Sequence, residues 1–299
     1  MNRVQTPDRM LSDWLTECLS LLAIKPKTVV GYQSLIRLVL RVMGDKPLSS
    51  IAPLDVQKFV IACSKEVSPS RTRQAYGYLR QSLEMAVTYG ELETSPCVNI
   101  KLPRIPQNEM QFLSSDEVEA LADECGRFGL FIRFLAYTGL RWGEAVALRM
   151  MDIEGQKVYV RRAQVDVNGK LSYSSPKNYK QRTVFMPSSL AKEVQVWGSP
   201  EQLLFRSERN KNLRSPNFNR AVWRPAIAAI GKEGLRIHDL RHTYCALMVQ
   251  AGVHPKAIQR AMGHSSITVT LDRYGHLLGN ALEEAAGSLE KLLARDEED

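Results

Sequence analysis

Apolar residues recur every three or four positions through the first hundred residues of the chain. The first such stretch follows Thr6, Pro7 and Asp8, which are typical of a helix start, and it predicts a helix over residues 7–23. The same spacing, with prolines at the starts and a glycine after one end, predicts three more helices over residues 26–43, 53–65 and 69–91. The first hundred residues are thus expected to form a four-helix unit.

The helical pattern stops between residues 94 and 109. Pro96, Pro103 and Pro106 cannot sustain a helix, and this composition suits an extended linker. We therefore divide the chain into a helical domain, a linker, a second domain and a C-terminal tail, which cover residues 1–93, 94–109, 110–279 and 280–299.

The second domain mixes helical and strand patterns. Ser114 and Glu117 have the spacing of a capping box, and the pattern is helical again from Pro216 onward. Between them, periodicity and alternation predict helices over 128–138 and 142–148 and strands over 157–162 and 182–187, with turns at 152–155 and 168–169. The predicted fold is mainly α with a small antiparallel sheet.

Length and composition restrict the class of protein. At 299 residues the chain exceeds the usual size of one hydrophobic core, which favours two domains. The five cysteines are odd in number and lack metal-binding or redox spacing, so we expect free thiols in a reducing cytoplasm. The N-terminus has no signal-peptide pattern, and the longest apolar stretch is short and interrupted by Arg133. We expect a soluble cytoplasmic protein without a membrane partner.

The net charge of +8 is unevenly distributed along the chain. Residues 282–299 contain seven acidic and two basic residues, so this segment carries −5 and leaves +13 for residues 1–281. A body this basic suits a polyanion such as DNA, whose binding releases counterions and depends steeply on salt. Basic charge alone does not establish nucleic-acid binding, because many basic proteins bind none.

Basic side chains gather in the fourth predicted helix and in the linker. Arg73, Tyr76 and Arg80 fall on one side of that helix, with Arg71 close by, where arginines could pair with DNA phosphates. A solvated basic face explains the same pattern equally well. The candidate DNA contacts in the linker are Lys101 and Arg104.

Two arginines of the second domain occupy positions where the guanidinium group is expected to need an anionic partner. Arg141 opens a predicted helix, and Arg241 is surrounded by apolar neighbours. Arginine is costly to bury unless it pairs with a carboxylate or a phosphate, and its planar fork can bind two phosphate oxygens at once. Glu144, one turn after Arg141, is the expected internal partner.

All five histidines follow residue 237. His238 and His242 are four residues apart, a spacing that also occurs in zinc sites. Arg241 lies between them on the same helix face and would repel a cation, and no carboxylate stands where a hydrolytic base is needed. We therefore expect no metal and no cofactor, while structural roles for individual histidines stay open.

Five short segments occur in a fixed order along the second domain. They are TGLRWGE from residue 138, PK at 176–177, HDLRH at 238–242, GH at 263–264 and Tyr274. This ordered set resembles the tyrosine recombinase (phage integrase) family, and the resemblance covers nearly the whole chain. It implies an N-terminal four-helix core-binding domain of the SAM-like type and a mixed α/β catalytic domain.

The resemblance also assigns roles to single residues. It implies that Arg141 and Arg241 bind the scissile phosphate and that Tyr274 attacks it to form a 3′-phosphotyrosine link. His238 is then expected to assist proton transfer, and His264 to hydrogen-bond the phosphate. A free tyrosine has a pKa of about 10, so its attack at neutral pH needs nearby cations or a proton acceptor.

The remaining assignments are a general acid and a supporting carboxylate. The resemblance implies that Lys177 protonates the leaving 5′-oxygen, with Lys180 as the alternative, and that Glu144 orients Arg141. Tyr274 as a core aromatic residue is the structural alternative to its role as a nucleophile. Its polar sequence neighbours make that alternative less favourable.

The leading hypothesis is therefore a site-specific recombinase that works without ATP or metal. The resemblance implies a compact phage or mobile-element integrase without a separate arm-site domain, acting as a homotetramer on a double-stranded DNA core site. An accessory directionality factor and docking of the tail on a neighbouring protomer are further expectations. The alternatives are a Xer-type resolvase of chromosome or plasmid dimers, a type IB topoisomerase-like enzyme and a non-catalytic DNA-binding protein of the same fold.

Overall fold

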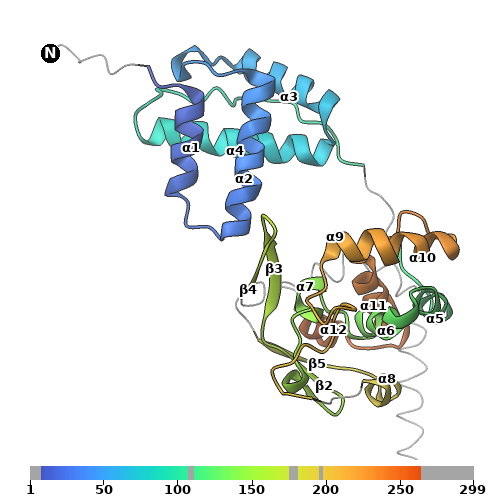
Figure 1. The fold of residues 1–299 in the computed structure, drawn as a ribbon. Helices are drawn as coiled ribbons and strands as arrows, with labels where there is room; N and C mark the ends of the chain where they lie inside the picture. Colours follow the sequence, from blue (N-terminus) through green and yellow to red (C-terminus); the bar gives the residue numbers. More distant parts are fainter. Residues whose placement is uncertain (1–7, 107–110, 175–180, 195–197, 264–299) are drawn as a thin grey trace, which may run out of the picture. The chain divides into compact units, whose positions relative to one another are not determined.

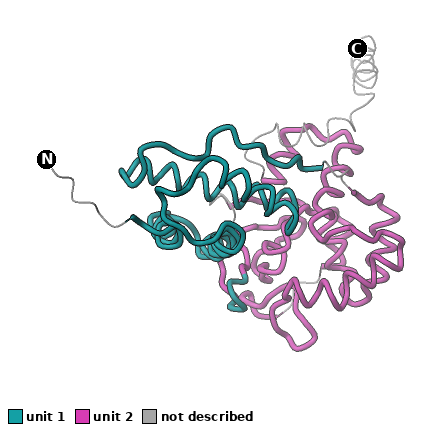
Figure 2. Tube along the Cα trace, turned by 90° about the horizontal axis from the view of Figure 1, so that it is seen from above, with its two compact units in different colours: residues 1–108, 166–170 teal, residues 109–165, 171–299 magenta. Residues whose placement is uncertain are grey.

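The computed structural model describes residues 8–106, 111–174, 181–194 and 198–263. The chain forms two compact units, which comprise residues 1–108 with 166–170 and residues 109–165 with 171–299 (Figure 2). Helices make up most of the first unit and are the main regular structure of the second, and short strands occur between residues 153 and 185 (Figure 1). The predicted fold class is confirmed. No helix within the described ranges is long and apolar enough to cross a bilayer.

The first unit is built from four helices around one apolar core. Their bounds are α1 Leu11–Leu21, α2 Pro26–Met43, α3 Pro53–Glu66 and α4 Pro69–Thr88, with a 3-10 turn at Leu48–Ser50. Buried apolar side chains of all four helices form a single cluster. The indole N–H of Trp14 donates to the carbonyl of Ser82 at 2.6 Å, and the Tyr78 hydroxyl donates to the carbonyl of Leu15 at 2.6 Å. These two bonds connect α1 to α4 inside the core.

Helix α1 begins at Leu11, four residues later than the sequence predicted. Asp8 does not stabilise a first helical turn, because its carboxylate accepts hydrogen bonds from the hydroxyl and the backbone N–H of Ser49. Met10 forms an isolated β-bridge with Pro47. Contacts with this distant segment replace the local helix start, so the helical prediction for residues 7–10 was wrong at the positions that the structure describes.

The predicted linker is attached to the first unit over part of its length. The backbone N–H of Lys101 donates to Gln57 Oε1 at 2.8 Å, and the carbonyl of Lys101 accepts from Gln57 Nε2 at 3.2 Å. Three partly buried apolar side chains of this segment pack against the helical core, namely Cys97, Ile100 and Leu102. The first unit therefore extends beyond residue 93, because these side chains find apolar partners on it.

The second unit places short helices around another apolar core. The helices are α5 Ser115–Glu124, α6 Gly129–Thr138, α7 Trp142–Ala145, α8 Ser188–Glu193, α9 Ser215–Phe218, α10 Arg224–Ala229, α11 Asp239–Gln250 and α12 Pro255–Met262. A π-helical turn, Asn219–Trp223, joins α9 to α10, and 3-10 turns lie at Gly126–Phe128 and Met150–Asp152. The predicted capping box opens α5, since Ser114 Oγ accepts from the Glu117 N–H and Glu117 Oε2 accepts from the Ser114 N–H.

The strands form two small antiparallel sheets rather than one. The strands are β1 Ile153–Glu154, β2 Lys157–Val160, β3 Ala163–Val167, β4 Lys170–Ser174 and β5 Arg182–Phe185. One sheet has the order β1-β2-β5, and β3 pairs with β4 as a separate hairpin. In the first sheet Val158 pairs with Val184 and Val160 pairs with Arg182, and all three valines are buried. This register fixes Arg182 at the start of β5, next to the apolar core.

Candidate active site

The turn between α6 and α7 carries Arg141. Gly139 ends α6 in a left-handed conformation with a φ of 64°. A Cβ atom at this position would lie 2.4 Å from Cδ1 of Tyr244, so there is no room for a side chain. Glycine meets both requirements because it lacks Cβ and tolerates positive φ. The tight turn therefore brings Arg141 close to α11, the helix that contains Tyr244.

Glu144 lies at the centre of the positive charges around this turn. Its side chain is buried, and it accepts hydrogen bonds from the backbone N–H of Arg141 at 2.9 Å and from Arg141 Nη1 at 3.0 Å. Arg182 of β5 donates to the same carboxylate twice, from Nη1 to Oε1 at 3.0 Å and from Nη2 to Oε2 at 2.7 Å. The pairing of Arg141 with Glu144 that the sequence spacing predicted is present, and a second arginine shares the carboxylate.

The charge state of Glu144 follows from these contacts. Burial alone would raise the pKa of a carboxyl group, because it disfavours the charged form. Here the hydrogen bonds and charges of Arg182 and Arg141 outweigh burial and lower the pKa of Glu144 to about 2. One carboxylate therefore faces two guanidinium groups at neutral pH. The three side chains together keep a net positive charge, as an anion-binding site requires.

Arg241 approaches the same turn from α11. It is only 3% exposed, and its guanidinium donates to the carbonyl of Gly139 through Nη1 and to the carbonyl of Met262 through Nη2. The two backbone carbonyls fix the orientation of the guanidinium. Arg141, in contrast, keeps 27% of its side chain exposed. Of the two arginines predicted to bind phosphate, Arg141 is thus accessible and Arg241 is buried.

His238 stands at the N-terminus of α11, three residues before Arg241. Its ring centroid is 5.4 Å from that of His242, and the two rings are nearly perpendicular. Although solvent reaches His238, the protein atoms packed around it lower the pKa of its imidazole below the ordinary value, and the charges of Arg241 and Arg141 lower it further. A neutral imidazole at neutral pH can accept a proton.

The C-terminal end of α12 meets two of these arginines. Nε of Arg182 donates to the carbonyl of Ala261 at 3.1 Å, and Arg241 donates to the carbonyl of Met262. The last carbonyls of a helix have no partner within the helix and carry partial negative charge. The arginines supply these partners. They thereby join the end of α12 to β5 and α11, directly before the Gly263-His264 segment of the sequence.

The described residues contain part of the predicted catalytic set. Arg141, Glu144, His238 and Arg241 come together around the α6–α7 turn. The predictions for Lys177 or Lys180 as general acid, His264 as phosphate ligand and Tyr274 as nucleophile fall outside the described residues. Within the described ranges, no group of three or more His, Cys, Asp or Glu side chains could hold a metal ion.

Arg182 is a site residue that the sequence analysis missed. It occurs in the segment KQRTVF, whose alternation predicted a strand, and a basic residue at the end of a strand is usually a solvated one. Its partners Glu144 and Ala261 lie 38 and 79 residues away in the chain. The sequence contained one indirect indication of a further partner. Glu144 was assigned a single cationic partner, although the two oxygens of an ionised carboxylate can accept hydrogen bonds from several donors.

The basic face predicted on α4 differs from the expectation at one position. Tyr76 is buried in the helical core, and burial raises the pKa of its hydroxyl, so its ring does not lie on the exposed face with the arginines as predicted. Arg73 and Arg80 are exposed, while Arg71 donates to Ser34 of α2 at 2.6 Å. Alanine and tyrosine positions on this helix pack inward, and the arginines remain at the surface.

The exposed arginines are restrained by local partners. Nε of Arg73 donates to the carbonyl of Pro103 at 2.7 Å, and Arg80 pairs with Glu84 one turn later at 2.6 Å. Lys101 and Arg104 are exposed in the segment that follows Cys97. A DNA phosphate near Arg80 would therefore compete with Glu84 for the guanidinium.

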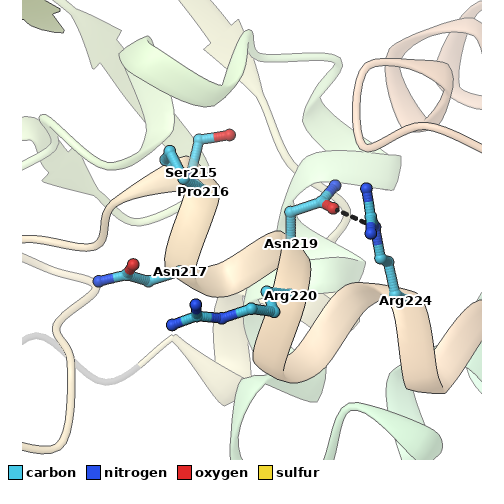
Figure 3. Close-up of a pocket in the computed structure, with 6 residues that line it drawn as sticks. All are labelled: Ser215, Pro216, Asn217, Asn219, Arg220 and Arg224. Carbon is cyan, nitrogen blue, oxygen red and sulfur yellow. Dashed lines mark hydrogen bonds between the residues drawn. The ribbon is translucent and has the colours of Figure 1, made fainter.

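A polar recess of about 450 Å³ lies on the surface of α9, the π-helical turn and the start of α10 (Figure 3). Asn219 accepts a hydrogen bond from Nε of Arg224 at 3.0 Å, and Asn217 and Arg220 project from the same helical surface. Phe218 and Trp223, five residues apart, are both buried beneath it. The wider π-helical turn thus anchors two aromatic rings while it presents amide and guanidinium groups to solvent.

The chain is similar to known integrases in sequence and in fold. Residues 111–280 match the model of the family described as "Phage integrase family". The integrase of Mycobacterium phage FRAT1 is 29% identical over 240 residues, which cover 75% of this chain and 71% of that protein.

Two solved structures have the same fold at low sequence identity. The Tn1549 transposon integrase in complex with transposon right end DNA is 19% identical, with a TM-score of 0.78, and the match covers 95% of this chain and all of that one. A lambda integrase tetramer bound to a Holliday junction is 20% identical, with a TM-score of 0.68, over 87% of this chain and 79% of the other.

Proposed function

This chain belongs to the phage integrase family and is a site-specific recombinase of the tyrosine type, and from that premise we propose that it is the integrase of a phage or mobile element. Its substrate is a double-stranded DNA attachment site, which it cuts and rejoins without ATP or metal. The observation that carries this proposal is the grouping of Arg141, Glu144, His238 and Arg241 around one turn.

In the proposed reaction, Arg141 and Arg241 bind the nonbridging oxygens of the scissile phosphate. Oη of Tyr274 attacks phosphorus, the bond to the 5′-oxygen breaks, and the DNA 3′-phosphate becomes linked to the protein. Fixed guanidinium groups stabilise the extra negative charge that develops on the pentacovalent transition state. The energy of the phosphodiester bond is kept in the phosphotyrosine, so a 5′-hydroxyl of the partner strand can reverse the step and join the exchanged strands.

Protons move to and from two side chains in this scheme. His238 accepts the proton of Tyr274, a role that suits its lowered pKa because the neutral ring is the proton acceptor at neutral pH. Lys177 donates a proton to the leaving 5′-oxygen, with Lys180 as the alternative. His264 donates a hydrogen bond to the phosphate. When the strand is rejoined, the same protons return to their donors.

Two surfaces are proposed to bind the duplex outside the site of cleavage. The first is the basic face of α4 with Arg71, Arg73 and Arg80, extended by Lys101 and Arg104, whose positive charges suit the phosphate backbone. The second is the recess on α9 and α10, where the exposed amide and guanidinium groups match the hydrogen-bonding groups of base edges in a major groove (Figure 3).

Assembly on DNA is proposed to involve four protomers, as in the lambda integrase tetramer on a Holliday junction. The segment 280–299 is proposed to dock on a neighbouring protomer. A groove of about 1130 Å³ on the second unit suits it, because the groove combines Met186 and Met248 with the basic residues Lys256 and Arg260. The segment itself is acidic and carries apolar residues at helical spacing. An accessory directionality factor would add control over the direction of exchange.

Covalent capture tests the central proposal. The protein is incubated in EDTA with a pool of nicked duplexes of randomised sequence, and complexes that survive denaturation are isolated and their DNA is sequenced. We expect one recurring sequence in the wild-type complexes and no covalent complex for Tyr274→Phe. A covalent complex in the Phe variant, or a requirement of the wild type for magnesium, contradicts the proposed mechanism.

The recovered sequence then separates the alternatives. A topoisomerase-like enzyme relaxes supercoiled plasmids that lack the sequence, whereas a recombinase joins two duplexes that contain it. A Xer-type resolvase is indicated if the recovered sequence resolves plasmid dimers without a second type of site. A non-catalytic DNA-binding protein is indicated if the protein binds DNA but gives no covalent complex. Removal of residues 280–299 tests docking, since the proposal requires loss of tetramer formation with DNA binding retained.

A further inference from the structure

Arg182 occupies the point where three parts of the second unit meet. Its guanidinium forms a two-pronged pair with Glu144, at 3.0 and 2.7 Å, and Nε donates to the carbonyl of Ala261 at 3.1 Å. Only 12% of the side chain is exposed. Through these contacts, the first residue of β5 connects the α6–α7 turn to the C-terminal end of α12.

The contacts of Arg182 decide how Glu144 is shared with Arg141. A carboxylate binds an arginine most tightly when both oxygens face the guanidinium fork. Arg182 takes this position, whereas the side chain of Arg141 contacts Glu144 through a single nitrogen, Nη1. Without Arg182, both oxygens of Glu144 would be available to Arg141. Its guanidinium would then turn toward the carboxylate and away from the exposed side where a phosphate binds.

The second contact concerns the end of α12. The carbonyl of Ala261 accepts from Arg182, and the neighbouring carbonyl of Met262 accepts from the buried Arg241. Gly263 follows in a left-handed conformation with a φ of 61°, and a Cβ atom added there would lie 3.3 Å from Nε of Arg182. The arginine therefore packs directly against the residue that precedes His264.

We propose that Arg182 is a positioning residue that sets the orientation of Arg141 and the end of α12 before DNA binds. This inference rests on the proposed function, since it concerns the same phosphate. Arg182 does not contact the phosphate or donate the leaving-group proton. It acts by occupying the two-pronged side of Glu144, so that the charge of Arg141 stays available to the substrate.

Lysine is the informative replacement for Arg182. It keeps the positive charge, and therefore the electrostatic partner of Glu144, but a single ammonium group cannot supply the planar fork and the Nε–H bond to Ala261 together. A role that depends only on charge survives Arg182→Lys. A role that depends on geometry does not.

The matched control is Arg133→Lys. Arg133 also connects two parts of the second unit, through the carboxylates of Glu193 at 2.8 Å and Glu119 at 3.3 Å, and only 21% of its side chain is exposed. It makes none of the contacts described for the α6–α7 turn. Both variants thus remove one bridging guanidinium, and only one of them disturbs the site.

The experiment measures the single-turnover rate of covalent complex formation on the recovered nicked duplex, with binding affinity and melting temperature measured alongside. For Arg182→Lys we expect a rate about 100-fold below that of the wild type, because small errors in the position of reacting groups cause losses of this size. The affinity for DNA should stay within about twofold of the wild-type affinity. Arg133→Lys should keep the wild-type rate. An unchanged rate for Arg182→Lys overturns the proposal, as does a rate loss that Arg133→Lys shows equally.

A double-mutant cycle tests whether Arg182 acts through Arg141. If it does, the rate loss of the double variant Arg141→Gln, Arg182→Gln should be well below the product of the two single losses. Multiplicative losses would overturn the proposal.

A duplex with sulfur in place of the leaving 5′-oxygen adds a separate check, because sulfur needs no proton on departure. Rescue of Arg182→Lys by this duplex would assign Arg182 to proton donation instead.

The outcomes also separate this inference from the proposed function. If the wild type gives no covalent complex on any duplex, the proposed function fails. If the wild type reacts and Arg182→Lys reacts equally fast, the proposed function stands and only the role of Arg182 is wrong.

Discussion

Arginines on the two units of this chain have different surroundings. Around the α6–α7 turn, Arg182 and Arg241 are largely buried, and carboxylate oxygens or backbone carbonyls fix their guanidinium groups. On α4, Arg73 and Arg80 are exposed and each has one local partner. The first arrangement fixes the geometry of positive charge on largely buried side chains, whereas the second leaves its charges at the surface, where salt can screen them. We therefore expect changes in the first group to affect reaction rate, and changes in the second group to affect affinity for DNA.

The largest effect is expected from Arg241→Ala. The substitution removes a buried positive charge that two carbonyls hold in place, and we expect the rate of covalent complex formation to fall about 10³-fold. Single-turnover measurements on the recovered nicked duplex provide the test. DNA affinity, measured in the same buffer, should change by less than tenfold. A rate near that of the wild type would remove Arg241 from the catalytic group.

Glu144→Gln should lower stability more than any change at the α4 arginines. The carboxylate stabilises the fold because its pKa falls from an ordinary value of 4.5 to about 2, and a shift of this size corresponds to about 3 kcal/mol at neutral pH. Urea unfolding should show this loss. Because the folded-state pKa is the lower one, the contribution is complete above pH 4.5 and disappears as the pH falls toward 2. The stability difference between wild type and variant should therefore shrink in that range, and a constant difference would contradict the assignment.

His238→Gln should lower the cleavage rate about 100-fold at neutral pH, as loss of a general base does. In the wild type, the protein atoms packed around His238 and the charges of the two arginines hold the pKa of its imidazole below the ordinary value of 6.5. The neutral ring is the acceptor, so the rate should fall only when the pH drops below that value, and the variant should lack this acid limb. An acid limb centred above pH 6.5 would show that the arginines do not act on the ring in the working enzyme.

The two regions also differ in how much of their structure the sequence could reveal. The Arg141–Glu144 pair is local, with a spacing of three residues, and the apolar neighbours of Arg241 indicated its burial. Arg182 could not be found in this way, because its partners are 38 and 79 residues distant and are brought to it by the pairing of β5 with β2. Helix periodicity located all four helices of the first unit.

Periodicity failed where tertiary contacts decide the outcome. Asp8 bonds to Ser49 instead of starting a helix, so α1 begins later than its local sequence indicates. Tyr76 was grouped with Arg73 and Arg80 by a spacing of three and four residues, yet the interhelical packing of α4 takes its ring into the core. Residue spacing defines the face of a helix only to within about one position. An error of one position is enough to confuse a buried ring with an exposed guanidinium.

The smallest effects are expected on α4, and they should have opposite signs at two neighbouring positions. Arg80→Ala removes one phosphate contact, so it should weaken DNA binding a few-fold and reduce the slope of log affinity against log salt by about 1. Glu84→Gln releases Arg80 from its 2.6 Å partner and removes a like charge from the DNA surface, so it should strengthen binding.

Tyr76→Phe is the matched control for these two changes. The Tyr76 ring is buried, and removal of its hydroxyl leaves the surface charge of α4 unchanged, so DNA affinity should stay at the wild-type value. Titrations at several salt concentrations distinguish the three variants. If Arg80→Ala and Glu84→Gln both weaken binding, the pair acts as a structural contact of the helix. The DNA-binding face would then have to lie elsewhere on the first unit, away from the helix turn that carries Arg80.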